Sequence, residues 1–80
     1  MMDATTATRN ALAGIAPEAD LDDLAPDVDL QEELDLDSMD FLNFLIALGE
    51  ATGVRVPESD YGQVRTFGGC VAYVAAHSPA

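Results

Sequence analysis

The chain has 80 residues, and its 15 Asp and Glu against 3 Lys and Arg leave a net charge of −12. A chain of this length forms one domain, which we expect to span residues 1–80, and it buries only about 60% of the surface that its unfolded form exposes. The single thin core that results leaves no room for a cleft that encloses a substrate. The negative surface repels nucleic-acid phosphates and anionic lipid headgroups. We therefore expect basic partners, and no nucleic acid or membrane.

No signal of export or membrane insertion is found in the sequence. Cys70 is the only cysteine, so the chain cannot form an internal disulfide. The N-terminal residues lack the basic stretch and apolar run of a signal peptide, and no segment approaches the ~20 apolar residues that cross a bilayer. We expect a cytoplasmic monomer.

The first predicted helix covers residues 4–16, and a long acidic segment follows at residues 18–37. Pro17 ends the helix, whose apolar residues recur at helical spacing: Ala7, Ala11, Leu12 and Ile15. In the acidic segment Pro26 and paired acids break any period, which predicts a loop with one helical turn near residues 31–34. We expect the loop to be held on the core by Leu21, Leu24, Val28, Leu30 and Leu34.

The acids are concentrated in one part of the sequence. Eleven of the 15 lie between Glu18 and Asp40, a stretch without Lys or Arg. This predicts a localised negative field that steers basic partners and also destabilises the fold by self-repulsion.

The clearest helix is predicted over residues 38–52. Asp37 is a good N-cap, Asp40 stands three residues later as in a capping box, and Gly53 lies where a C-terminal glycine belongs.

After this helix, residues 54–57 are predicted to be a non-helical connection and residues 58–63 a short turn. Thr66 then caps a last helix that reaches His77. Gly68 and Gly69 weaken the first turn of that helix by roughly 1 kcal/mol each relative to Ala. Its predicted inner face consists of Phe67, Cys70, Val71 and Val74. The fold class is all-α, a bundle of three to four small helices with a long first loop.

The helix at residues 38–52 has two apolar faces. At 3.6 residues per turn, one side carries the usual core stripe of Phe41, Phe44, Leu45 and Leu48. The roughly opposite side carries Met39, Leu42 and Ile46, beside Asp40, Asn43 and Glu50. This second set either packs under the long loop or forms an exposed apolar surface framed by acids, which is typical of a docking site.

Ser38 lies at the start of this helix, where free N–H groups and the helix dipole favour a phosphate group. By position alone it is equally a capping residue. The surrounding run Leu34-Asp35-Leu36-Asp37-Ser38-Met39-Asp40 resembles the Leu-Gly-x-Asp-Ser-Leu attachment signature of the acyl carrier protein family. The resemblance covers nearly the whole chain, because similar residues follow in register without a gap: Ala47-Leu48, Glu50, Val54-x-Val56-Pro57, Thr66 and Tyr73-Val74.

This resemblance implies a carrier and not an enzyme. A phosphopantetheinyl transferase would move the 4'-phosphopantetheine arm of coenzyme A to the Ser38 hydroxyl, and the thiol of the arm would carry acyl groups as thioesters. The helix at residues 38–52 would be recognised by the transferase and by acyl-loading and acyl-processing enzymes with basic docking surfaces. The expected docking residues are Asp37, Met39, Asp40, Leu42, Asn43 and Ile46. A fatty-acid, polyketide or specialised acyl pathway is implied.

The sequence departs from the family pattern at three positions. Asp35 stands where the family usually has Gly, and Asp tolerates left-handed backbone better than most residues. Asn43 and Gly49 replace commonly acidic residues. The recognition helix is therefore less acidic than in typical fatty-acid carriers, while the preceding loop is more acidic.

Other functions find weaker support. Ser38 and His77 lie at opposite ends of different elements, and no Gly-x-Ser-x-Gly elbow is present, which argues against a hydrolase. Four acids suggest a calcium-binding loop: Asp27, Asp29, Asp35 and Asp37. The residues around them do not supply the central Gly and the final Glu that an EF-hand requires. We expect Cys70 to be a small buried apolar residue and His77 to be exposed or a cation at a helix end. A peptidyl or aminoacyl carrier, and an unmodified acidic interaction module, remain open.

Overall fold

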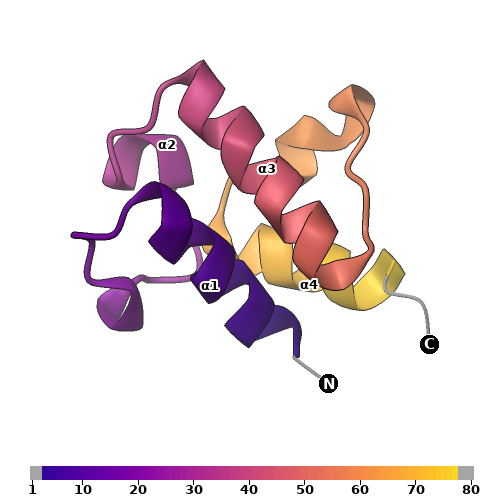
Figure 1. The fold of residues 1–80 in the computed structure, drawn as a ribbon, viewed down its shortest axis with the longest axis horizontal. Helices are drawn as coiled ribbons and strands as arrows, with labels where there is room; N and C mark the ends of the chain where they lie inside the picture. The colour runs from indigo at the N-terminus through magenta and orange to yellow at the C-terminus, as the bar shows by residue number, and fades with distance from the viewer. Residues whose placement is uncertain (1–2, 78–80) are drawn as a thin grey trace.

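The computed structural model describes residues 3–77, which form three principal helices (Figure 1). These are α1 (Ala4–Ile15), α3 (Ser38–Thr52) and α4 (Phe67–His77). Shorter elements lie between them: the 3₁₀ helix η1 (Leu21–Asp23), the single α-helical turn α2 (Leu30–Glu33) and the 3₁₀ helix η2 (Glu58–Val64). The described residues include no strand, so the all-α prediction is confirmed. The turn predicted near residues 31–34 is α2, whereas η1 was not predicted.

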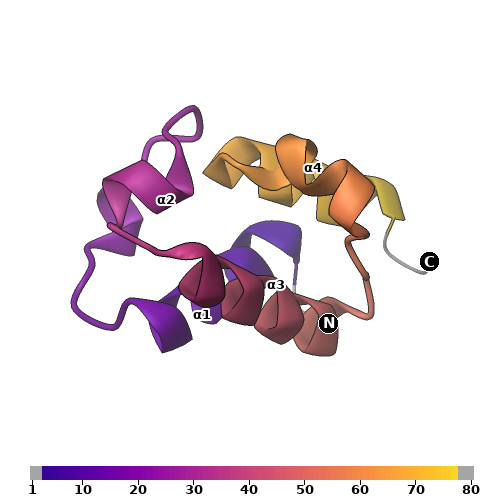
Figure 2. The same cartoon turned by 90° about the horizontal axis from the view of Figure 1, so that it is seen from above.

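The helices bury one face each against a shared core. Helices α1 and α3 lie side by side and antiparallel (Figure 1), and α1 also packs against α4. Figure 2 shows η2 and α4 on one side of the molecule and α1 and α3 on the other. The most deeply buried apolar side chains come from all parts of the chain: Ala7, Leu12, Leu30, Phe44, Leu48, Val64 and Cys70. No helix in the described part of the chain has both the length and the apolar character needed to cross a membrane.

The helix ends follow the capping chemistry of the sequence. Thr66 Oγ1 accepts a hydrogen bond from the Gly69 N–H at 3.0 Å, which confirms it as the cap of α4. At the end of α3, Gly53 adopts the left-handed conformation with φ of 77°, as predicted for a C-terminal glycine.

The long acidic loop is fastened to the start of α4 by backbone contacts. Asp29 and Thr66 form an isolated antiparallel bridge, and the Leu30 N–H donates to the Arg65 carbonyl at 2.8 Å. A further bond of 2.8 Å joins the Gly68 N–H to the Pro26 carbonyl. Four of the five predicted anchors are confirmed, since Leu21 and Leu30 are buried and Leu24 and Leu34 are half-buried against the core. Val28 is half-buried but is not among the residues that pack against the core.

The structure gives a reason for the glycines that begin α4. A Cβ at Gly69 would overlap the Gln63 carbonyl oxygen, and one at Gly68 would lie 3.0 Å from the Pro26 carbonyl oxygen. The close approach of the preceding backbone therefore explains why two residues of low helix propensity stand at the beginning of α4.

The predicted inner face of α4 is confirmed but incomplete. Val71 packs half-buried against the core, and Tyr73, which was not predicted there, is buried as well. The Tyr73 hydroxyl donates to Asp60 Oδ2 at 2.7 Å, and the Asp60 carboxylate raises the pKa of Tyr73. This hydrogen bond provides the polar partner that allows a tyrosine to be buried.

Added salt is expected to stabilise this fold. The ion pairs found among the described residues, Arg9 with Asp22 and Arg65 with Asp29, engage two acids of the 18–40 segment. Salt also screens the repulsion among the remaining acids of this segment. If this stabilises the fold by roughly 1 kcal/mol, Tm rises by about 4–8 °C. Thermal melts across a series of sodium chloride or millimolar magnesium concentrations measure this, and a Tm that stays flat or falls would contradict it.

Candidate functional site

Ser38 is the first residue of α3, and its side chain is exposed. Within the described part of the chain its hydroxyl has no hydrogen-bond partner. The exposed hydroxyl at a helix start is thus free to become the attachment point of a larger group.

The N-cap of α3 is Asp37 and not Ser38. Asp37 Oδ1 accepts from the Asp40 N–H at 2.8 Å, and Asp40 Oδ2 accepts from the Asp37 N–H at 3.4 Å. The predicted capping box is therefore confirmed. Since Asp37 supplies the cap, a purely capping role for Ser38 is wrong. The remaining N–H groups of the first turn and the positive end of the helix dipole lie at the end of α3 that carries Ser38, and they favour an anion there.

The backbone reaches Asp37 through a left-handed residue. Asp35 has φ of 54°, which is the unusual angle expected where the family signature has Gly. Asp adopts this conformation at lower cost than most residues. The departure from the signature is therefore compatible with the turn that leads into α3.

The second apolar face of α3 is exposed. Met39, Leu42 and Ile46, here called the apolar ridge, are 64%, 38% and 52% exposed. The core stripe on the other side is buried: Phe41, Phe44, Leu45 and Leu48. Packing of the ridge under the long loop is therefore wrong, and the alternative of an exposed surface is confirmed. Asn43 lies exposed on α3 between ridge residues, and Asp40 lies near its beginning.

A hollow of about 520 Å³ opens beside Ser38, between α2, α3 and η2. We call it the Ser38 hollow. Its lining combines apolar and polar side chains: Gln31, Ser38, Phe41, Leu42, Glu58, Tyr61, Gly62 and Arg65. The rings of Phe41 and Tyr61 meet edge to face, with centroids 6.1 Å apart.

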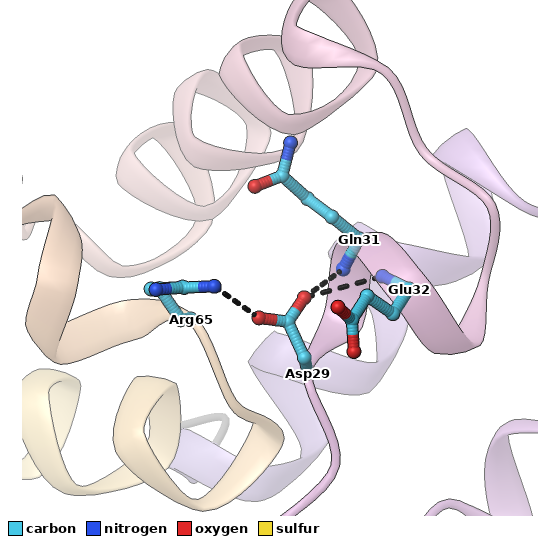
Figure 3. Close-up of polar contacts among 4 residues, drawn as sticks. All are labelled: Asp29, Gln31, Glu32 and Arg65. Atoms are coloured by element: carbon cyan, nitrogen blue, oxygen red, sulfur yellow. Dashed lines mark hydrogen bonds and ion pairs between the residues drawn. The ribbon is translucent and has the colours of Figure 1, made fainter.

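One ion pair links the two walls of this hollow (Figure 3). Arg65 donates to Asp29 Oδ2 at 2.8 Å, and Asp29 Oδ1 accepts from the N–H groups of Gln31 and Glu32 at 3.0 and 3.2 Å. The Glu32 N–H, and then Arg65, lower the pKa of Asp29 below its usual range. Sequence reasoning missed this pair, because Asp29 was considered only as a calcium ligand and its partner is 36 residues away.

Cys70 and His77 are outside the site. Cys70 is buried, its thiol donates to the Val64 carbonyl at 3.2 Å, and burial raises its pKa to about 12. It is the small buried residue that was predicted. His77 stacks on Tyr73 with ring centroids 4.0 Å apart, at the exposed end of α4. Across residues 3–77 the structure contains no group of three His, Cys, Asp or Glu that could hold a metal ion.

Comparison with known proteins agrees with this geometry. The family model described as "Phosphopantetheine attachment site" matches residues 7–74. An acyl carrier protein of Lactobacillus johnsonii is 33% identical over 72% of this chain and 72% of its own length. One from Renibacterium salmoninarum is 31% identical over 84% of this chain and 78% of its own length. A "Meromycolate extension acyl carrier protein" of Mycobacterium bovis is 29% identical over 79% of this chain and 51% of its own length. The chain therefore belongs to the acyl carrier protein family, whose members carry acyl groups on a covalent phosphopantetheine and catalyse no reaction themselves.

Proposed function

We propose that Ser38 carries the 4'-phosphopantetheine arm of this acyl carrier. The observation that supports this most strongly is the exposed Ser38 hydroxyl at the start of α3, next to a capping box that leaves the serine itself unused. Ser38 also falls within the residues that the family model matches.

The residues around Ser38 suit this attachment. Ser38 Oγ supplies the oxygen of the new phosphodiester and loses its proton, while the bond between the phosphate and the nucleotide part of coenzyme A breaks. The start of α3 favours the anionic phosphate that results. When bound, the arm supplies a terminal thiol that carries acyl groups as thioesters.

Incubation with coenzyme A and a promiscuous phosphopantetheinyl transferase tests the proposal. We expect the intact mass of the protein to increase by one phosphopantetheine, and fragmentation to place the added mass on Ser38. A chain that several transferases leave unmodified, or an adduct located on another residue, would contradict the assignment.

Partner recognition is proposed to use the N-terminal half of α3. The apolar ridge, with Asn43 beside it, provides exposed apolar surface next to Asp37 and Asp40. Met39 suits a surface that meets several enzymes, because its flexible side chain adapts to different shapes. The partners are the phosphopantetheinyl transferase and acyl-loading and acyl-processing enzymes. Those that dock here would have basic side chains around an apolar contact.

Asp40→Asn is expected to slow modification of Ser38 by about two- to fivefold at low salt, because it removes one steering charge. The amide oxygen of Asn can still accept in the capping box, so the helix start is retained. The rate of adduct formation, followed by mass, measures the effect, and the difference should disappear at high salt. Asp27→Asn, the same change at an exposed acid in the loop before α2, is the control. Equal slowing by both variants would show that only net charge matters.

We further propose that the chain works as a monomer in the cytoplasm. The thiol of the arm must stay reduced to form thioesters, and the cytoplasm keeps thiols reduced. A net charge of −12 also opposes self-association.

A further inference from the structure

A second hollow adjoins the start of α3, and it has no lining residue in common with the Ser38 hollow. It has a volume of about 490 Å³, and we call it the acidic groove. One wall consists of residues 15–19, at and after the end of α1, and the other consists of residues 33–36 together with Asp40 of α3. Because α1 and α3 are antiparallel, this end of α1 lies beside the start of α3 (Figure 1). The acidic groove is therefore at the end of the molecule that carries Ser38.

The charged side chains of the acidic groove are all negative. Its lining includes four acids and, among the described residues, no Lys or Arg: Glu18, Glu33, Asp35 and Asp40. The ion pairs found within residues 3–77 engage other acids, so these four carboxylates have no cationic partner there. Unpaired carboxylates around one hollow repel each other, and a cation placed among them relieves that repulsion.

Between the acids the lining is apolar. Ile15 and Leu34 are half-buried and pack against the core. Leu36 is also half-buried, but it is not among the described side chains that pack against the core. Leu36 therefore offers apolar surface to a ligand in the groove. A ligand that combines an apolar group with a cation is complementary to this lining.

The arrangement of the acids suits a cationic side chain better than a chelated metal ion. Residues 3–77 contain no group of three His, Cys, Asp or Glu that could hold a metal ion, so the carboxylates are spread around the groove. Arginine and lysine carry their charge on a long apolar stem, which can lie along the apolar lining while the charge reaches the acids. A guanidinium also has five N–H donors and can contact more than one carboxylate at once.

We propose that the acidic groove is a second docking site, which binds a segment of a partner enzyme that presents an arginine or lysine next to an apolar side chain. This inference rests on the proposal that partners dock at the start of α3. Asp40 belongs to both surfaces, so an enzyme that covers the apolar ridge also reaches the groove. Contact at two adjoining sites holds such an enzyme more tightly than either site alone.

Titration of the full, unmodified chain with N-acetylated dipeptide amides tests this proposal. The probes are leucyl-arginine, its uncharged analogue leucyl-citrulline, and glycyl-arginine, which lacks the apolar side chain. We expect leucyl-arginine to shift the backbone N–H NMR signals of the groove residues with a Kd in the millimolar range. Each of the other two probes should bind about three- to tenfold more weakly, because one lacks the charge and the other lacks the apolar contact.

Two double variants of equal net charge assign the binding to the groove. Glu18→Gln combined with Glu33→Gln removes two acids of the lining and should weaken leucyl-arginine binding by about three- to tenfold. Asp20→Asn combined with Glu32→Gln removes two exposed acids that do not line the groove, and it should leave the Kd unchanged. Leu36→Ala should weaken binding of leucyl-arginine but not of glycyl-arginine. A thermal melt of each variant verifies that the fold is retained.

Three results would overturn the inference: no shift of the groove signals, binding of either analogue as tight as that of leucyl-arginine, or equal weakening by the two double variants. The last result would show that the peptide responds to net charge alone. None of the three bears on attachment at Ser38, because the titrated protein is unmodified. Failure of Ser38 to accept phosphopantetheine would instead contradict the proposed function and would leave the titration unaffected.

Discussion

Replacement of Ser38 by Ala is expected to abolish attachment of phosphopantetheine and to leave the fold intact. The hydroxyl is the proposed attachment point, so its loss removes the nucleophile. Stability should change by less than about 0.5 kcal/mol, because the side chain is exposed and Asp37 caps the helix. Intact mass after incubation with coenzyme A and a transferase measures the first effect, and a thermal melt measures the second.

Ser59→Ala is the matched control for this experiment. Ser59 is also exposed, but it lies within η2 and not at the start of an α-helix. We expect this variant to be modified at the wild-type rate. An adduct that persists in Ser38→Ala, or that is lost in Ser59→Ala, would be inconsistent with Ser38 as the attachment site.

The second large effect is expected from Leu45→Ala, which should destabilise the protein by about 2–5 kcal/mol. Leu45 is only 7% exposed and belongs to the core, so its truncation removes buried apolar contacts and leaves a cavity. Small domains have a free energy of unfolding of about 5–15 kcal/mol, of which this is a large share. Chemical or thermal unfolding measures the loss.

Leu42→Ala makes the same chemical change on the apolar ridge, and Leu42 is 38% exposed. It should cost less than about 1 kcal/mol. Its main effect is expected on the rate at which the transferase modifies Ser38, because the ridge is the proposed docking surface. If Leu42→Ala destabilised the protein as much as Leu45→Ala, or left the modification rate unchanged, the ridge would not be the docking surface.

The sequence by itself determined the helices and the attachment residue that we propose. Helix ends are encoded by local capping chemistry, as Asp37 with Asp40 and Thr66 show. The core stripe of α3 follows from helical periodicity, because side chains three and four residues apart share one face. Asp35 was expected to need an unusual backbone angle from its position in the signature, and its φ of 54° confirms this.

Only the tertiary structure decided which groups from distant parts of the chain meet. Exposure of the apolar ridge depends on where the long loop runs, and the pairing of Asp29 with Arg65 joins residues 36 positions apart. Tyr73 is buried beside the predicted inner face of α4, and its hydroxyl finds a partner in Asp60, 13 residues earlier in the chain. The Ser38 hollow likewise exists because α2, α3 and η2 come together around it. Periodicity and capping act within one turn of helix, whereas such contacts depend on how all of the segments pack at once.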